Sequence, residues 1–256
     1  MNIRYDQMVT FEQNAAKSFE DRAIDYLVEH FPDKCNAIGS ENLPDLVRLA
    51  RMRSATHYIY GERGIMMYLH LMFVLGSFFD YDLMYPWAGQ TLAGTVYAKE
   101  DQRLQALWAK AEEYRKKVMG ENDEHLGRVL KTLHEEARQW PPPFVGGTPE
   151  DYVTHRLKDL YPEKTAFVGQ DRIKLLTQVG LKASRTYRLT NKSGISAYTT
   201  LMFMLGTYFD SDPQYKWASE VLKDESLKEP SDKANRLFSE AVKYLDMFAA
   251  PEAVSA

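Results

Sequence analysis

Hydrophobic residues recur along this chain every three or four positions, which is the spacing of a helix with one buried face. Leu104, Leu107 and Ala111 form one such stripe, and Leu237 and Ala241 belong to another. Because an α-helix has 3.6 residues per turn, this spacing places the apolar side chains on one side of each helix. No convincing alternation of apolar and polar residues predicts a strand. The pattern therefore predicts an all-α fold.

The second part of the sequence repeats the first at a spacing of 130 residues. Positions 71–82 read LMFVLGSFFDYD, and positions 201–212 read LMFMLGTYFDSD. Held without gaps, the same spacing pairs 27 identical residues between positions 20–114 and 150–244. An ungapped match of this length requires helices and loops of equal length in both copies, so we expect an internal duplication into two tandem repeats.

The hydrophobic pattern divides each repeat into roughly five helices. In the first repeat they are expected at residues 10–31, 44–59, 62–79, 83–94 and 100–118, with equivalents in the second. A further helix is expected near 122–139, and it leads to the break between the repeats.

Three consecutive prolines mark this break, in the sequence WPPPFVGG at positions 140–147. Prolines in a row cannot continue a helix. Thr148 and Pro149 follow, with acids in the next turn, and this is the pattern of a helix N-terminus. We expect a first repeat over residues 1–120, a bridging helix and linker over 121–147, and a second repeat over 148–256.

Composition and charge narrow the possible functions. The chain has 256 residues, of which 45% are hydrophobic and 27% charged, as in ordinary globular proteins. A net charge of −4 argues against a dedicated nucleic-acid-binding protein, which usually has a strongly basic face. The single cysteine, Cys35, fits a reducing compartment, and the polar N-terminus lacks the apolar core of a secretory signal. We therefore expect a cytoplasmic protein.

The longest apolar run, at residues 65–79, is too short to cross a membrane, which takes about 20 residues. Its counterpart at 195–209 contains one serine and three threonines. We expect both segments in a protein core.

Two aspartates follow this apolar segment in each repeat: Asp80 and Asp82, then Asp210 and Asp212. A calcium loop needs further oxygen ligands at alternating positions and a closing glutamate, and neither repeat has them. Asp212 precedes a proline, which is the pattern of an N-cap. We interpret the aspartates as helix caps.

Aromatic and methionine residues of the repeats are expected to pack in the core. Trp87 and Trp217 occupy equal positions, as expected of residues that wedge between helices. An adaptable binding groove is the alternative for the methionines. These are Met66, Met67, Met72, Met202 and Met204.

The sequence contains no recognisable catalytic motif. The six histidines lack the spacing of a metal site; they are His30, His57, His70, His125, His134 and His155. There is no GxSxG turn or phosphate-binding glycine loop, and Cys35, which is followed by Asn36-Ala37-Ile38, lacks the basic partner pattern that marks a nucleophile. The pairs Glu112-Glu113 and Glu135-Glu136 lie among basic residues, which is typical of a solvated face. We predict no catalytic residue, cofactor or metal, although an enzyme with a dispersed site stays open.

The pattern LMFxLGxxFDxDxxxxWA resembles one found in a poorly characterised group of bacterial proteins, encoded beside type VI secretion spike and effector genes. Shorter matches accompany it at residues 3–8, 11–12, 19–22 and 30–32. The resemblance covers residues 1–92 well and the second repeat only in part. It implies a binding role, either as a cytosolic immunity protein that neutralises a cognate effector or as an adaptor that loads an effector onto the spike. It carries no catalytic residues.

Differences between the repeats at equal positions favour a protein partner over two identical small ligands, although drift after duplication produces the same pattern. The pairs are His57/Tyr187, Tyr58/Arg188, Met84/Gln214 and Pro86/Lys216. Immunity is the interpretation we favour; an adaptor, an enzyme or effector, and a structural homodimer are the alternatives. The contact face is left open, and neither nucleic acid nor membrane is expected as a partner.

Overall fold

A computed structural model describes residues 5–94, 99–138, 140 and 147–247 of the chain. Within these ranges there are thirteen α-helices and no strand, so the predicted all-α fold is confirmed. We refer to the residues up to 120 as the first half and to those from 148 as the second half.

The first half contains six α-helices: α1 (Tyr5–His30), α2 (Pro32–Ile38), α3 (Leu43–Thr56), α4 (Glu62–Leu75), α5 (Pro86–Leu92) and α6 (Glu100–Tyr114). A π-helical turn, Arg115–Met119, and the bridging helix α7 (Glu124–Ala137) follow. The second half contains α8 (Pro149–Leu160), α9 (Pro162–Val168), α10 (Gln170–Thr186), α11 (Lys192–Leu205), α12 (Lys216–Lys223) and α13 (Pro230–Asp246). Short 3-10 turns lie at Ser40–Asn42 and Pro213–Tyr215.

Equivalent helices occur in the same order in the two halves. The bounds of α2 and α9, and those of α4 and α11, differ by 130 residues at both ends. The expected unit of roughly five helices did not include α2 and α9, because Pro32 and Pro162 mark the end of the preceding helix as readily as the start of a new one. The expected helix at 62–79 ends at Leu75, because Gly76 adopts a φ of 101° that ordinary helical residues do not adopt.

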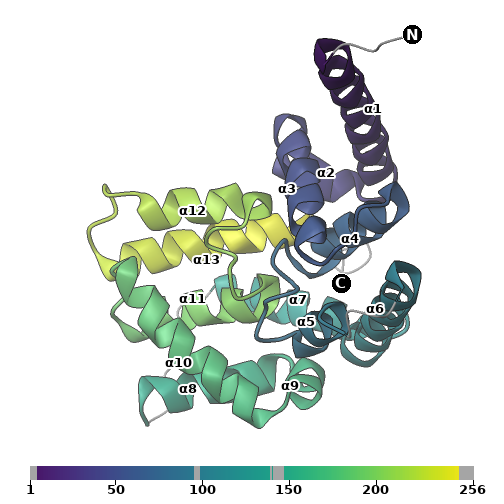
Figure 1. Ribbon diagram of the computed structural model, residues 1–256. Coiled ribbons are helices and arrows are strands. Elements are labelled where there is room, and N and C mark those ends of the chain that lie inside the picture. Colours follow the sequence, from purple (N-terminus) through teal and green to yellow (C-terminus); the bar gives the residue numbers. More distant parts are fainter. Residues whose placement is uncertain (1–4, 95–98, 139, 141–146, 248–256) are drawn as a thin grey trace.

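Figure 1 shows the helices of the second half gathered on one side and α1–α4 on the other. The N-terminal end of α1 projects away from the remaining helices (Figure 1). Buried hydrophobic residues of both halves form one continuous cluster, so the halves share a core.

The helix N-terminus predicted at Thr148 and Pro149 is confirmed. The Thr148 hydroxyl accepts a hydrogen bond from the Asp151 backbone N, and the Asp151 carboxylate accepts one from the Thr148 backbone N, which together cap α8. The prolines of the expected break, at 141–143, lie outside the described residues. Among the helices that are described, none combines the length and the hydrophobicity that crossing a bilayer requires.

Candidate functional site

The repeated acidic motif lies where the two halves meet. The Asp82 carboxylate accepts hydrogen bonds from the backbone N and the hydroxyl of Thr207, at 2.6 and 2.8 Å. The Asp212 carboxylate accepts the equivalent bonds from Ser77, at 2.7 and 2.6 Å. All four residues are buried, so each half supplies the acceptor that the other half needs after its apolar helix.

The two aspartates also form local caps. Asp82 accepts a bond from the backbone N of Met84, and Asp212 accepts one from that of Gln214 at the start of a 3-10 turn. The cap interpretation is therefore confirmed for Asp212 and holds in part for Asp82. The bonds to the opposite half were not foreseen, because nothing local in the sequence identifies a partner more than 100 residues away.

Two glycines at this junction cannot be replaced without strain. Gly76 and Gly206 have φ values of 101° and 111°, which residues with a Cβ atom rarely adopt. A Cβ atom on Gly76 would lie 3.0 Å from the Leu205 carbonyl oxygen, and one on Gly206 would lie 3.0 Å from an Asp82 carboxylate oxygen. Close approach of the two halves therefore accounts for glycine at both positions.

A lysine accompanies each aspartate: Lys164 is buried and Lys34 is partly buried. The Lys34 ammonium donates a hydrogen bond to the Phe73 carbonyl at the end of α4, and the Lys164 ammonium donates one to the Phe203 carbonyl at the end of α11. Burial lowers the pKa of each lysine to about 8, although Asp212 acts on Lys34 and Asp82 acts on Lys164 in the opposite direction. Each lysine thus caps a helix of its own half beside an aspartate of the other.

Because the pKa values of these two lysines are lowered in the folded protein, we expect the free energy of unfolding to rise between pH 8 and pH 9. Above pH 8 the folded protein releases the two protons, whereas the unfolded chain still binds them because its lysines have the ordinary pKa of about 10.4. The unfolded state then binds more protons, so the free energy of unfolding increases with pH, by about 2 kcal/mol for both lysines together. Urea denaturation at a series of pH values measures this increase. Lys164→Met should remove about half of it, and a flat or falling profile contradicts the assignment.

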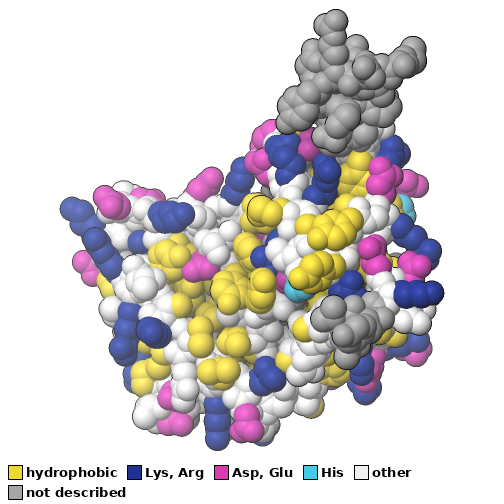
Figure 2. Space-filling view, viewed as in Figure 1, with side chains coloured by type: hydrophobic (Ala, Val, Ile, Leu, Met, Phe, Trp, Pro, Cys, Tyr) yellow, Lys and Arg dark blue, Asp and Glu magenta, His cyan; other side chains and the backbone are white. Residues whose placement is uncertain are grey.

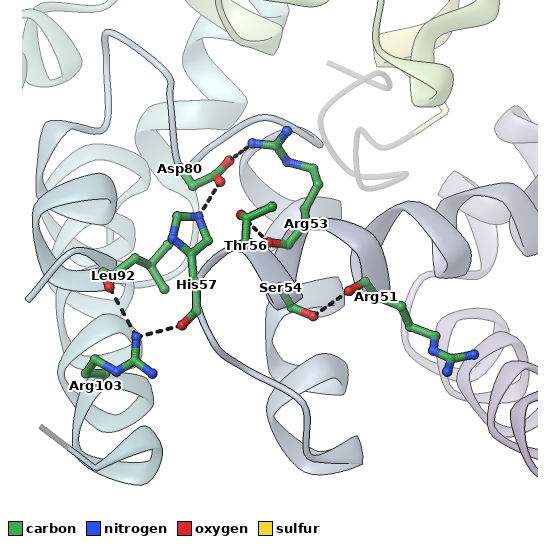
Figure 3. Close-up of polar contacts among 8 residues, drawn as sticks. All are labelled: Arg51, Arg53, Ser54, Thr56, His57, Asp80, Leu92 and Arg103. Atoms are coloured by element: carbon green, nitrogen blue, oxygen red, sulfur yellow. Dashed lines mark hydrogen bonds and ion pairs between the residues drawn. The ribbon is translucent and has the colours of Figure 1, made fainter. Parts of the chain in front are cut away.

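The first aspartate of the motif has a different environment. The Asp80 side chain is fully buried and pairs with Arg53, while the His57 Nε2 lies 2.7 Å from an Asp80 oxygen. Figure 3 shows both partners reaching Asp80 from the C-terminal end of α3 and the residue after it. Burial raises the pKa of Asp80, but hydrogen bonds from His57 and Arg53 outweigh this effect and hold the pKa below its usual value. Asp80 is therefore an ion-pair partner, and the prediction that it caps a helix was wrong.

Arg103 fixes the turn that carries His57. Its guanidinium donates hydrogen bonds to the carbonyls of His57 and Leu92, at 2.7 and 3.2 Å (Figure 3). The next residue, Tyr58, adopts a φ of 56°, an uncommon conformation for a residue with a side chain. The turn is held by charge-assisted bonds to backbone atoms, so it presents Tyr58 in a defined position.

A histidine bonded to a buried aspartate resembles part of a catalytic dyad, but its neighbours do not complete one. The Ser54 and Thr56 hydroxyls donate to the carbonyls of Arg51 and Arg53 in their own helix, as Figure 3 shows. Neither hydroxyl is therefore bonded to His57 as an activated nucleophile would be.

The equivalent site in the second half indicates a structural role. Asp210 accepts hydrogen bonds from the Tyr187 and Tyr198 hydroxyls, at 2.8 and 2.7 Å. Tyr187 occupies the position of His57, and burial together with its bond to Asp210 raises the pKa of Tyr187 to about 12. A neutral phenol cannot take up a proton at neutral pH. In both halves side-chain donors satisfy the aspartate, which is buried in the first half (Asp80) and partly buried in the second (Asp210).

Four large apolar side chains are exposed around this cluster, and we call them the tyrosine patch. Tyr58 is 71% exposed, Tyr60 66%, Tyr81 58% and Met52 64%. The Tyr81 ring lies 4.7 Å from the Arg53 guanidinium carbon, and Met52 and Tyr60 line a hollow of about 370 Å³. Figure 2 shows hydrophobic side chains gathered near the middle of this face, with a histidine among them. Exposed apolar side chains that are clustered in this way mark interaction sites.

The second half has no such patch at the equivalent positions. The residues there are Lys182, Arg188, Thr190 and Ser211. The backbone is nevertheless the same, because Arg188 has a φ of 63°, close to that of Tyr58. The sequence comparison singled out only Tyr58. At the other three positions an apolar residue of the first half also corresponds to a polar or charged residue of the second half, so the same comparison could have identified them. That the four side chains are exposed could be learned only from the structure.

The other candidate residues have packing roles or line one groove. Trp87 and Trp217 pack against Tyr114 and Tyr244, as predicted. Met72 and Met202 are buried in the core, and Met204 packs partly buried against it, whereas Met66 and Met67 line a groove described below. Cys35 is buried, and burial raises the pKa of its thiol, so it is not an activated nucleophile.

One charged pair was misassigned from the sequence. Glu136 does not lie on a solvated face, because both of its oxygens accept hydrogen bonds from the guanidinium of Arg156, which is buried. By contrast, Glu113 pairs with Lys110 and Lys117 on an exposed helix face, as predicted. Spacing along a helix does not show which charges another helix covers.

No protein-family model, curated protein or solved structure matches this chain. Across the described ranges, no three His, Cys, Asp or Glu side chains come close enough together to hold a metal ion.

Proposed function

We propose that this protein is a non-enzymatic binding protein whose tyrosine patch contacts a protein partner. The observation that carries the proposal is the exposure of Met52, Tyr58, Tyr60 and Tyr81 on one half only. Tyrosine is enriched among the residues that contribute most to protein interfaces, since a rigid ring provides large contact area at low conformational entropy cost. Arg53 and Arg103 hold the turns that carry these rings, so the surface is organised before binding.

We also propose that the halves arose by internal duplication. The common spacing of the helices supports this, and so do the reciprocal bonds of Asp82 and Asp212. In this proposal the junction residues stayed the same because both halves need them. The exposed turn was free to change, and only one copy acquired the patch.

As the specific role we propose a cytosolic immunity protein that binds and neutralises a type VI secretion effector. This step rests on the resemblance of the repeated motif. Most of the motif residues are buried, and the second aspartate of each copy lies at the junction of the halves, so the motif accounts for a shared scaffold. Recognition of one particular effector would then depend on the patch, which lies outside the junction contacts.

The test is co-expression with the effector encoded beside the gene. An immunity protein restores growth of cells that express the effector in the cytosol and co-purifies with it in a stoichiometric complex that buries upward of about 1,200 Å². An adaptor does not restore growth, but its deletion abolishes effector delivery. If the protein neither binds the effector nor affects its delivery, the proposal is wrong.

A substitution at His57 tests the proposal that the protein is not an enzyme. His57→Tyr introduces the residue of the second half and keeps a donor for Asp80 while removing the imidazole. Protection against the effector should be unchanged. A folded His57→Tyr protein that binds the effector and no longer protects the cell would indicate catalysis by His57.

A further inference from the structure

The first half has an open groove between α1, α4 and α6. It encloses about 490 Å³ and is lined by Tyr26, Arg63, Met66, Met67, His70 and Trp108, among others. The His70 Nδ1 lies 2.8 Å from the Tyr26 hydroxyl. Burial lowers the pKa of His70, and the nearby His30 lowers it further, which favours the uncharged ring. The positive charge of this groove therefore comes from Arg63, which is exposed.

The equivalent positions of the second half are covered. Arg156, Ser196, Ala197 and Thr200 are all buried, whereas Tyr26, Met66, Met67 and His70 are only partly buried. The equivalent of Trp108 is Phe238, which is 2% exposed. The groove of the first half is thus open, whereas the equivalent surface of the second half is covered.

The second half's groove is filled by the bridging segment of the same chain. The Trp140 ring stacks on the Phe238 ring with centroids 3.8 Å apart, and the Arg156 guanidinium carbon lies 5.3 Å from the Trp140 ring centre. Glu136 accepts two hydrogen bonds from Arg156, at 2.6 and 2.5 Å. Trp140 and Glu136 therefore anchor this segment through one stacked pair and one forked ion pair.

The bridging segment has a simple sequence pattern. Val129 and Leu133 of α7 are 0% and 2% exposed, and Glu136 and Trp140 continue their line at spacings of three and four residues. This groove, in the half where it is filled, thus holds an amphipathic helix and an aromatic anchor three residues beyond the end of that helix.

We propose that the groove of the first half binds an amphipathic helix of a partner protein, one that carries an acidic residue followed four residues later by an aromatic one. The aromatic ring stacks on Trp108 as Trp140 stacks on Phe238. The carboxylate pairs with Arg63, and the apolar side chains of the helix cover Met66 and Met67. A small ligand would also fit the volume, but the filled counterpart favours a helix. The surface is distinct from the tyrosine patch, so the inference goes beyond the proposed function.

The test uses a peptide of residues 124–140, which carries this pattern, labelled with a fluorophore and added to the full-length protein. We expect saturable binding with a Kd below about 100 μM. A peptide with Glu136→Lys and Trp140→Ala should bind about tenfold more weakly or worse, because it lacks both anchors.

Protein variants locate the peptide. Trp108→Ala should weaken binding about tenfold, and Arg63→Glu should do so too without disturbing the core, because Arg63 is exposed. Tyr60→Ala should bind the peptide as the wild type does, so failure at the patch and failure at the groove are distinguishable. The proposal is overturned if no saturation occurs up to about 1 mM. It is equally overturned if Trp108→Ala and Arg63→Glu bind normally, because the peptide then displaces α7 from the second half instead.

Discussion

Replacing Asp82 or Asp212 with alanine is expected to lower the free energy of unfolding by about 3–5 kcal/mol. Each substitution removes the acceptor of a buried hydroxyl and of a buried backbone N in the opposite half. It also removes the carboxylate near a lysine, namely the buried Lys164 for Asp82 and the partly buried Lys34 for Asp212. Buried donors without partners cost far more than exposed ones, which water satisfies. Urea denaturation followed by circular dichroism measures the loss.

Two controls separate this effect from a general loss of charge. Asp25→Ala changes an exposed aspartate of α1 and should leave the stability unchanged. A double-mutant cycle of Asp82→Ala with Thr207→Val should give a coupling energy of about 0.5–3 kcal/mol, because the two side chains bond directly. Losses below about 1 kcal/mol in both single aspartate variants would show that the junction does not hold the halves together.

Replacing Tyr58 and Tyr60 together with alanine is expected to weaken binding of the partner protein about 100-fold or more. Both rings are largely exposed in the free protein, and burying such rings at the centre of an interface typically contributes about 2 kcal/mol or more each. The free energy of unfolding should change little, because neither ring is packed in the core. Titration calorimetry with the purified effector measures the affinity.

The second half provides a matched control for this pair. Arg188→Ala with Thr190→Ala alters the equivalent positions on an equivalent turn, and it should change the affinity by less than about threefold. Equal losses for the two pairs would mean that the partner contacts both halves alike. A loss for the second pair alone would place the contact surface on the second half and contradict the proposed patch.

Buried contacts at the junction are alike in the two halves, whereas exposed surfaces differ between them. The junction contacts recur in both halves, with Asp82 and Asp212 as acceptors and Lys34 and Lys164 as helix caps. The exposed turn after α3 and the groove beside α4 differ between the halves. A rigid frame with two unlike surfaces suits a protein that recognises one asymmetric partner.

Helix type, helix order and the cap of α8 could be predicted from the sequence, because each depends on residues within one or two turns of one another. The apolar period identified α4 and α11, and the Thr148-Pro149 pattern identified the start of α8. The equal spacing of the repeats predicted the equal bounds of these helices. The short helices α2 and α9 were missed, since each begins at a proline that the sequence alone does not distinguish from the end of the preceding helix.

Only the tertiary structure decided which side chains are covered and by what. Asp82 meets Thr207, and Glu136 meets Arg156, because separate helices pack together, and no local pattern encodes such pairs. Exposure has the same origin: Met66 remains accessible, while its equivalent, Ser196, is buried in the half whose groove the bridging segment fills. The sequence repeat thus determined the order and bounds of the helices, whereas the position of the bridging segment decided which of the two grooves is covered.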